Sequence, residues 1–131
     1  MSNSRADHLP SFRIRWALAL LALGFAGSAL AQTAPPGFVA SPEIYKVIAE
    51  NDKYRVIEVS WKPGQKDQGH SHPDAATYFL TNCLLRNQLP GNPAQDAVRV
   101  AGKAGVQPPI ASHTIENIGT TDCRLIMFEP K

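Results

Sequence analysis

The sequence lacks several features that would point to common classes of protein. Its 131 residues are too few for a dinucleotide-binding domain plus a substrate domain. Beyond residue 31, no apolar run approaches the roughly 20 residues needed to cross a bilayer. No segment after residue 32 keeps the 3.6-residue apolar spacing of an amphipathic helix. Hydrolytic triads, phosphate-binding loops and paired catalytic carboxylates are also absent, so function has to be sought in other residues.

The first 31 residues have the composition of an export signal. Arg5, Arg13 and Arg15 precede an apolar run over 16–25, and small residues then lead to Ala31. This order is typical of a secretory signal peptide, with cleavage predicted after Ala31. The stretch from 16 to 31 is short for an uncleaved anchor, which is the alternative. No adjacent arginine pair precedes the run, which favours the general export route. We therefore expect a periplasmic or secreted protein without stable membrane insertion.

Removal of residues 1–31 would leave a neutral chain. Of the 13 Lys and Arg and 11 Asp and Glu in the sequence, three arginines and one aspartate lie in that segment. The remaining 100 residues therefore carry ten charges of each sign. Because no basic stripe or patch remains, a nucleic-acid partner is not expected.

Both cysteines lie outside the export signal. In an oxidising compartment Cys83 and Cys123 could form a disulfide. They could equally remain two small, buried thiols, because spacing alone does not bring two Cα atoms within bonding range. A bridge would close a loop of about 40 residues and contribute roughly 3–4 kcal/mol in the chain-entropy interpretation.

The pattern after the export signal is that of short strands separated by turns. Residues 32–42 are predicted to be a flexible N-terminal linker. Residues such as Pro63-Gly64 and Gly119 mark turns between runs rich in β-branched and aromatic residues. The expected strands cover 43–49, 54–61, 77–88, 98–100, 113–118 and 123–128. The second of these is expected to place Ile57, Val59 and Trp61 on one face. The pattern predicts an all-β sandwich or barrel.

Three of the four histidines remain in this predicted domain. His70 and His72 are two residues apart, so on a strand they point to the same face, with Cα atoms about 6.5 Å apart. Two imidazoles on such a face can lean toward one metal ion at about 2.0–2.1 Å. A pair of this kind is common by chance, and two solvated histidines beside a turn are the alternative. The third histidine, His113, opens a later strand.

The surroundings of the histidines form two patterns. Gly64 stands six residues before His70, giving G-x5-H-x-H, and the second pattern is G-x5-P-x4-H-x3-N. The residues that make up the two patterns are Gly64, His70, His72, Gly102, Pro108, His113 and Asn117. Asn117 is expected on the same face as His113.

These patterns resemble the two motifs of the cupin superfamily, over about residues 43–129. The resemblance implies a single cupin-type conserved β-barrel, or jelly roll, of two antiparallel sheets in a domain spanning 43–131. It also implies that His70, His72 and His113 bind one divalent metal ion inside one end of the barrel. Cupins of this size often dimerise, so a homodimer is compatible with the resemblance.

The sequence departs from the cupin pattern at three positions. The glutamate expected after the second histidine falls on Ala76 or Thr77. One motif glycine falls on Ile110, and the glycine that closes the first motif falls near Cys83. Without the glutamate, three neutral imidazoles remain, a set that suits Fe, Zn, Mn, Ni or Cu with positions open to water or substrate. Asp74 is a secondary candidate ligand, with a solvated loop carboxylate as the alternative.

Other residues near the motifs complete the expectations. Tyr78 is expected to point inward, either as a catalytic hydrogen-bond donor or as a core aromatic. Ser71 and Glu116 alternate with the histidines and should face outward. A small-molecule enzyme of the oxygenase type is one function consistent with this set. The alternative is a non-catalytic module that binds or senses a small ligand, with the metal structural or absent, because one fold hosts many functions.

Overall fold

The computed structural model describes residues 33–131, and the predicted signal peptide at 1–31 lies outside the described residues. Within the described range the chain forms nine strands and one short helix. The helix is α1 (Gly37–Ala40), and the strands are β1 (Tyr45–Glu50), β2 (Tyr54–Trp61), β3 (His70–His72), β4 (Ala75–Phe79), β5 (Cys83–Gln88), β6 (Gln95–Arg99), β7 (Ala104–Gln107), β8 (Ile110–Asn117) and β9 (Cys123–Pro130). None of the described residues belongs to a helix with the length and apolar character needed to cross a bilayer.

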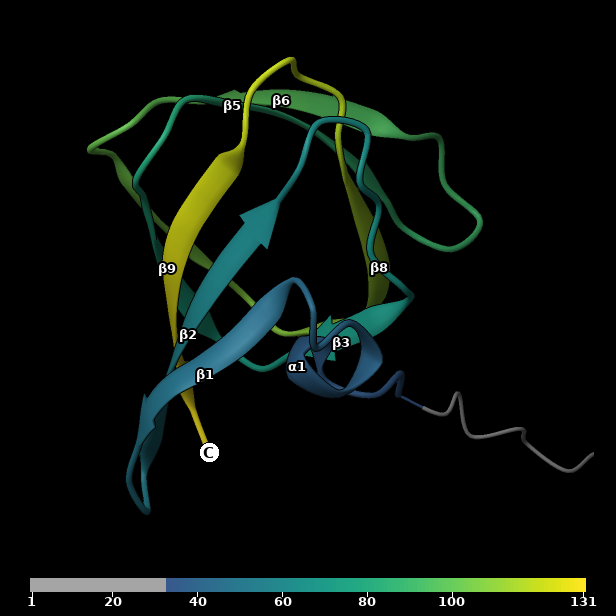
Figure 1. Cartoon of the computed structure of the whole chain (residues 1–131). Helices are drawn as coiled ribbons and strands as arrows, with labels where there is room; N and C mark the ends of the chain where they lie inside the picture. The colour runs from purple at the N-terminus through teal and green to yellow at the C-terminus, as the bar shows by residue number, and fades with distance from the viewer. Residues whose placement is uncertain (1–32) are drawn as a thin grey trace, which may run out of the picture. The chain divides into compact units, whose positions relative to one another are not determined.

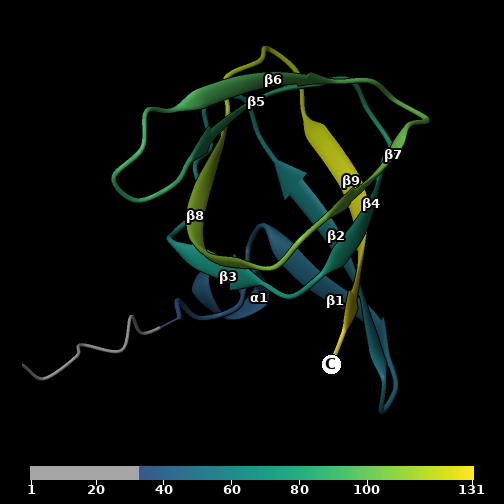
Figure 2. The same cartoon turned by 180° about the vertical axis from the view of Figure 1, so that it is seen from behind.

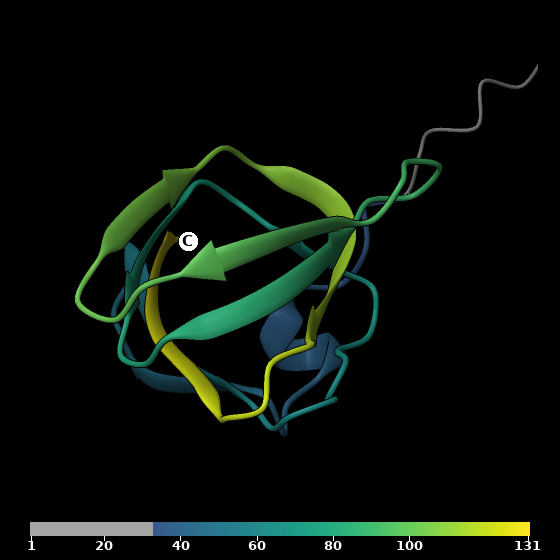
Figure 3. The same cartoon turned by 90° about the horizontal axis from the view of Figure 1, so that it is seen from above.

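The strands form two sheets, and every pairing between named strands is antiparallel. One sheet has the order β1-β2-β9-β4-β7, and the other has the order β3-β8-β5-β6. Figure 1 shows the first sheet beside the second, and Figure 3 shows the strands arranged as a ring when viewed from above. The predicted all-β jelly roll of two antiparallel sheets is confirmed.

Alternation along β2 and β9 builds the core between the sheets. Ile57, Val59 and Trp61, which were predicted to share one face of a strand, are all buried. They pair with Met127, Leu125 and Cys123 of β9 in strict register. Because side chains two residues apart share a face, the inner face of β9 continues to Glu129, which is also buried. The last inward position of this strand is therefore a carboxylate.

The predicted strand at 77–88 is two strands in different sheets. The chain leaves the first sheet after Phe79 and enters the second at Cys83. The short strand β7 (Ala104–Gln107), which pairs with β4, was not predicted, because glycine and proline around it gave a turn signal.

The segment expected to be a flexible linker is part of the barrel. The backbone N–H of Ser71 donates to the carbonyl of Pro35 (2.9 Å), and that of Ala34 donates to the carbonyl of Ala111 (3.0 Å). The Ser71 hydroxyl points out of the barrel, as predicted, and donates to the carbonyl of Ala34. Figures 1 and 2 show α1 beside β3. The linker prediction is therefore wrong for residues 33–42, because these backbone hydrogen bonds are made with residues distant in sequence.

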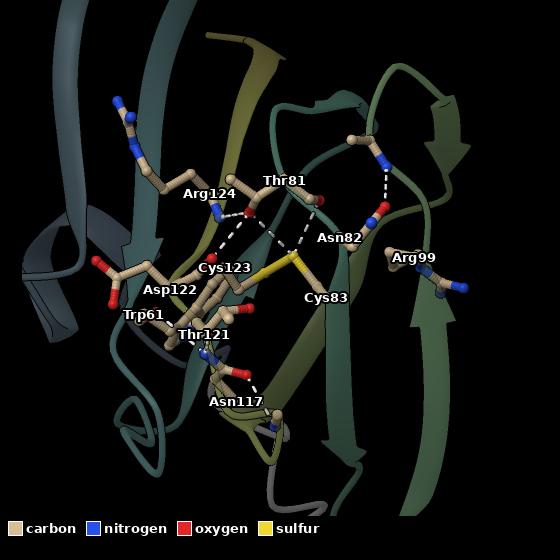
Figure 4. Close-up of a disulfide and its surroundings, with 12 residues drawn as sticks. Trp61, Thr81, Asn82, Cys83, Arg99, Asn117, Thr121, Asp122, Cys123 and Arg124 are labelled. Carbon is tan, nitrogen blue, oxygen red and sulfur yellow. Dashed lines mark hydrogen bonds between the residues drawn. A yellow bond between two sulfur atoms is a disulfide. The ribbon is translucent and has the colours of Figure 1, made fainter.

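The two cysteines form a disulfide between the sheets. Cys83 of β5 and Cys123 of β9 are joined, with their Cα atoms 5.1 Å apart. Figure 4 shows Thr81 beside the bond; its hydroxyl donates to the carbonyl of Asp122 (3.0 Å) and accepts from the N–H of Arg124 (2.8 Å). Of the two alternatives left open by the sequence, a disulfide or two free thiols, the structure shows the disulfide.

Gly64 has a positive φ of 76°, with no atom within 4 Å of where a Cβ would be. Replacing Gly64 by alanine is therefore expected to lower the free energy of unfolding by about 1–2 kcal/mol through backbone strain alone. Urea unfolding would measure this loss. Gly105→Ala is the matched control, because Gly105 lies in a strand with no positive φ and an ordinary contact 3.5 Å away. Equal stability of the two variants would contradict the assignment of strain to Gly64.

Candidate metal centre

The structure brings the three predicted histidines together inside the barrel. β3 carries His70 and His72, and the neighbouring β8 carries His113, which pairs with His70 in the ladder. Their exposed fractions are 0%, 5% and 5%. One ring nitrogen from each histidine lies within 4.8 Å of the others, and the Nε2 atoms of His70 and His72 are 2.9 Å apart. This cluster could hold a metal ion.

The far side of each ring is held by a hydrogen-bond acceptor. The Nδ1 of His70 lies 2.8 Å from the carbonyl of Gln68, and that of His72 lies 2.6 Å from Oε1 of Glu129. The Nδ1 of His113 lies 3.0 Å from Oδ1 of Asn87. An acceptor beside Nδ1 favours a proton on that nitrogen, which leaves Nε2 of each ring free to act as a ligand toward the interior. Metal-binding histidines in proteins are commonly oriented in this way.

The chemistry of the interior nitrogens fits a divalent cation. Nε2 of His113 is buried and makes no hydrogen bond among the described residues. The Nε2 atoms of His70 and His72 lie 2.9 Å apart; with the ring protons on Nδ1, both would present a lone pair, an arrangement that a positive charge beside them would stabilise. Two nitrogens at about 2.0–2.1 Å from one ion would be separated by about 3 Å, as these are. The residues present therefore fit a metal ion.

Burial favours the neutral form of two of the rings, those of His70 and His113. The pKa of His113 is lowered to about 3, mainly by burial and further by His70 and His72. The pKa of His70 is also lowered by burial, against the opposing effect of Asp67. Because a metal binds the deprotonated imidazole, these two rings do not have to lose a proton near neutral pH.

A buried polar group that the sequence analysis missed lies beside His70. Asp67 accepts hydrogen bonds from the hydroxyl of Tyr45 (2.7 Å), the indole N–H of Trp61 (3.2 Å) and the backbone N–H of Ile115 (2.6 Å). The hydroxyl oxygen of Tyr45 also lies 3.0 Å from Nε2 of His70. Burial, reinforced by Asp67, raises the pKa of Tyr45, so its phenol stays protonated.

Two of the predicted candidates lie away from the cluster. The side chain of Tyr78 is 49% exposed, so the inward orientation predicted for it is wrong. Asp74 is exposed and is not part of the cluster. The reason is that β3 and β4 belong to different sheets. At the corner formed by Pro73 and Asp74, the residues that face the interior change from even-numbered to odd-numbered positions. Thr77 and Phe79 therefore face the interior in place of Tyr78.

A cavity of about 430 Å³ adjoins the cluster. His72, His113 and Tyr45 lie on its wall, with apolar side chains such as Leu125 and Met127. Its size is within the range of small-molecule sites, about 300–1,000 Å³. The interior nitrogens therefore face a space that can hold a small molecule.

Glu129→Gln is expected to weaken metal binding by about ten- to a hundredfold, because a neutral amide replaces the carboxylate that orients His72. Competition with a chelator would measure the dissociation constant. Glu58→Gln is the control, since Glu58 pairs with Arg124 at the surface. An affinity unchanged within twofold would show that Glu129 does not support the site.

Comparisons with known proteins support the fold. No protein-family model and no curated protein sequence matches the chain. A cupin domain from Bordetella pertussis Tohama I is similar in structure, with a TM-score of 0.62 and 21% identity over 75% of this chain and 96% of that one. A protein with a double-stranded β-helix domain from Klebsiella pneumoniae has a TM-score of 0.54 and 20% identity, over 66% of this chain and 75% of that one. The chain has the cupin fold, and the predicted resemblance to the cupin superfamily is confirmed at that level.

Proposed function

We propose that the chain is an exported cupin that binds one divalent metal ion through His70, His72 and His113 and presents it to a small molecule. The observation that carries this proposal is the set of three Nδ1 contacts, to Gln68, Glu129 and Asn87, which leave all three Nε2 atoms directed inward. In this arrangement Nε2 of His113 is buried and has no hydrogen-bond partner among the described residues, which is unfavourable in free energy. A bound cation would offset that unfavourable term.

The coordination around such an ion favours a functional centre over a structural one. Within residues 33–131 the metal-ligating cluster contains three histidines and no fourth ligand. Structural sites are usually closed by four protein ligands, whereas catalytic sites keep a position open. The adjoining cavity supplies the space for a ligand at that position. We favour a small-molecule enzyme of the oxygenase type.

The chain's own residues would bind and orient the small molecule. A metal ion held here would supply Lewis acidity or the capacity to react with O₂. Phe79, Leu125 and Met127 would exclude water from the cavity that they line. The hydroxyl of Tyr45 donates its proton to Asp67, so on the cavity wall its oxygen is placed to accept a hydrogen bond from a bound molecule.

A non-catalytic binding or sensing module is the second candidate. The observation that favours it is the composition of the cavity wall, to which the described residues contribute no carboxylate. A general base is therefore not evident there. In this alternative function, the chain would bind the metal ion and a small molecule in the cavity without catalysing a reaction.

Elemental analysis of the purified protein tests the metal site directly. We expect about one equivalent of a first-row divalent metal per chain. Anaerobic loading with Fe(II), followed by measurement of O₂ uptake with candidate substrates, separates the two functions. Metal binding without any substrate-dependent uptake would favour the binding module, and absence of metal after loading with each candidate ion would end the proposal.

Export is tested by cell fractionation and N-terminal sequencing. We expect the mature chain outside the cytoplasm, beginning at Gln32. A chain that retains residues 1–31 in the cytoplasm would contradict this part of the proposal.

A further inference from the structure

The charges around the cavity all have one sign. Among the described residues that line it, the charged ones are Arg99 and Lys103, and both are cationic. Neither forms an ion pair with any other residue in the range 33–131. The acid on β6, Asp96, accepts two hydrogen bonds from Arg86, of 2.8 and 2.9 Å. Asp96 is therefore paired with Arg86 and not with either of the two cations.

The register of the strands places Arg99 on the inner face. Arg99 is paired with Cys83, and Ala97 is paired with Leu85. Directly opposed residues on neighbouring strands share a face, and Cys83 and Leu85 are both buried. Figure 4 shows Arg99 next to Cys83, with its guanidinium directed away from the disulfide. Arg99 therefore lines the cavity from β6, with its side chain exposed to solvent.

The same reasoning places Lys103 on the inner face of the other sheet. Thr77 pairs with Gly105, and the ladder continues where the N–H of Phe79 donates to the carbonyl of Lys103 (3.0 Å). Thr77 and Phe79 line the cavity, so their partners share that side. β6 and β7 are the edge strands of the two sheets, and the turn between them brings both cations to one rim, as Figure 2 shows for the two strands.

The rest of the wall is mainly apolar. Leu85, Ile115, Leu125 and Met127 line the same cavity as the two cations. A ligand that matches this wall has an apolar body and at least one negative charge. Arg99 and Lys103 are both exposed, so with a neutral ligand they would interact with water alone, whereas a cationic ligand would be repelled.

We propose that the cavity binds small organic acids with an apolar body, whose carboxylate is recognised by Arg99 and Lys103. This inference rests on the proposed function in one respect: it names the class of ligand that the same cavity would bind. The interaction is a charge-assisted hydrogen bond, which is about twice as strong as a neutral one. A role in protecting the sheet edges from pairing with another chain is the competing explanation for inward charges on edge strands.

The test is isothermal titration calorimetry on the purified chain, both metal-loaded and metal-free. The probes are butanoate, hexanoate, benzoate, phenylacetate and 4-phenylbutanoate, each compared with its uncharged amide. We expect at least one acid to bind about tenfold more tightly than its amide. The double variant R99Q/K103Q should lose this preference. The control K46Q/K53Q removes the same net charge from exposed lysines outside the cavity and should keep it.

The outcomes distinguish this inference from the metal site. Equal affinity for every acid and its amide overturns it, as does a preference that persists in R99Q/K103Q. Self-association of R99Q/K103Q in analytical ultracentrifugation, with its carboxylate preference intact, would assign the two cations to edge protection. Metal content is measured on the same samples. A chain that takes up no metal but shows the preference, lost in R99Q/K103Q, would refute the metal centre and retain the carboxylate site.

Discussion

Replacing His113 by alanine is expected to reduce bound metal from about one ion per chain to near zero while preserving the fold. The variant removes one of three neutral nitrogen ligands from the cluster. Among residues 33–131, Nε2 of His113 is buried and has no hydrogen-bond partner, so its removal also relieves an unfavourable desolvation. We expect the free energy of unfolding of the metal-free variant to stay within about 1 kcal/mol of the parent.

Two measurements check this expectation together. Elemental analysis gives the metal content, and thermal unfolding with and without added metal gives the stabilisation by binding. An ion at a hundred times its dissociation constant should stabilise the parent by about 2.7 kcal/mol and the variant hardly at all. Ser71→Ala is the matched control, since Ser71 lies between two of the histidines but points to Ala34. Retention of the full stabilisation by His113→Ala would remove that residue from the metal site.

Replacing both cysteines by alanine is expected to lower the free energy of unfolding by about 4 kcal/mol. The disulfide closes a loop of 40 residues, and in the chain-entropy treatment a loop of that length restricts the unfolded chain by about this amount. Domains of about 100 residues are stable by only about 5–15 kcal/mol. The bridge therefore accounts for a large fraction of the total.

Urea unfolding under oxidising and reducing conditions would measure this effect. Reductant should destabilise the parent by an amount close to the mutational loss and should leave C83A/C123A unchanged. The double substitution avoids leaving a single thiol that could pair between chains. A loss below about 1 kcal/mol would mean that the reduced, unfolded chain is already restricted in some other way.

The sequence predicted the elements whose signals are local. The two-residue period alone placed Ile57, Val59 and Trp61 on one face of a strand, and His70 with His72 on one face of another. The same period could have identified Glu129, because it follows Cys123, Leu125 and Met127 at inward positions of one strand. Its role was missed because the partner, His72, is 57 residues away.

Features that depend on a change of sheet could not be read from the sequence. The alternation of inward and outward side chains is interrupted at Pro73-Asp74. The prediction for Tyr78 was wrong because it continued the alternation across this corner. The docking of residues 33–42 depends on backbone hydrogen bonds to Ser71 and Ala111, which composition does not reveal. The disulfide required Cys83 and Cys123 to be neighbours across the sheets, a fact of tertiary structure.

Because of where the disulfide lies, its oxidation or reduction is expected to affect the geometry of the histidines. β5 carries Cys83 and also Asn87, which holds His113, while β9 carries Cys123 and also Glu129, which holds His72. One covalent bond thus connects the two strands that orient two of the three rings. Reduction would let those strands separate more freely, so a protein made under reducing conditions should release metal faster than the same protein after oxidation.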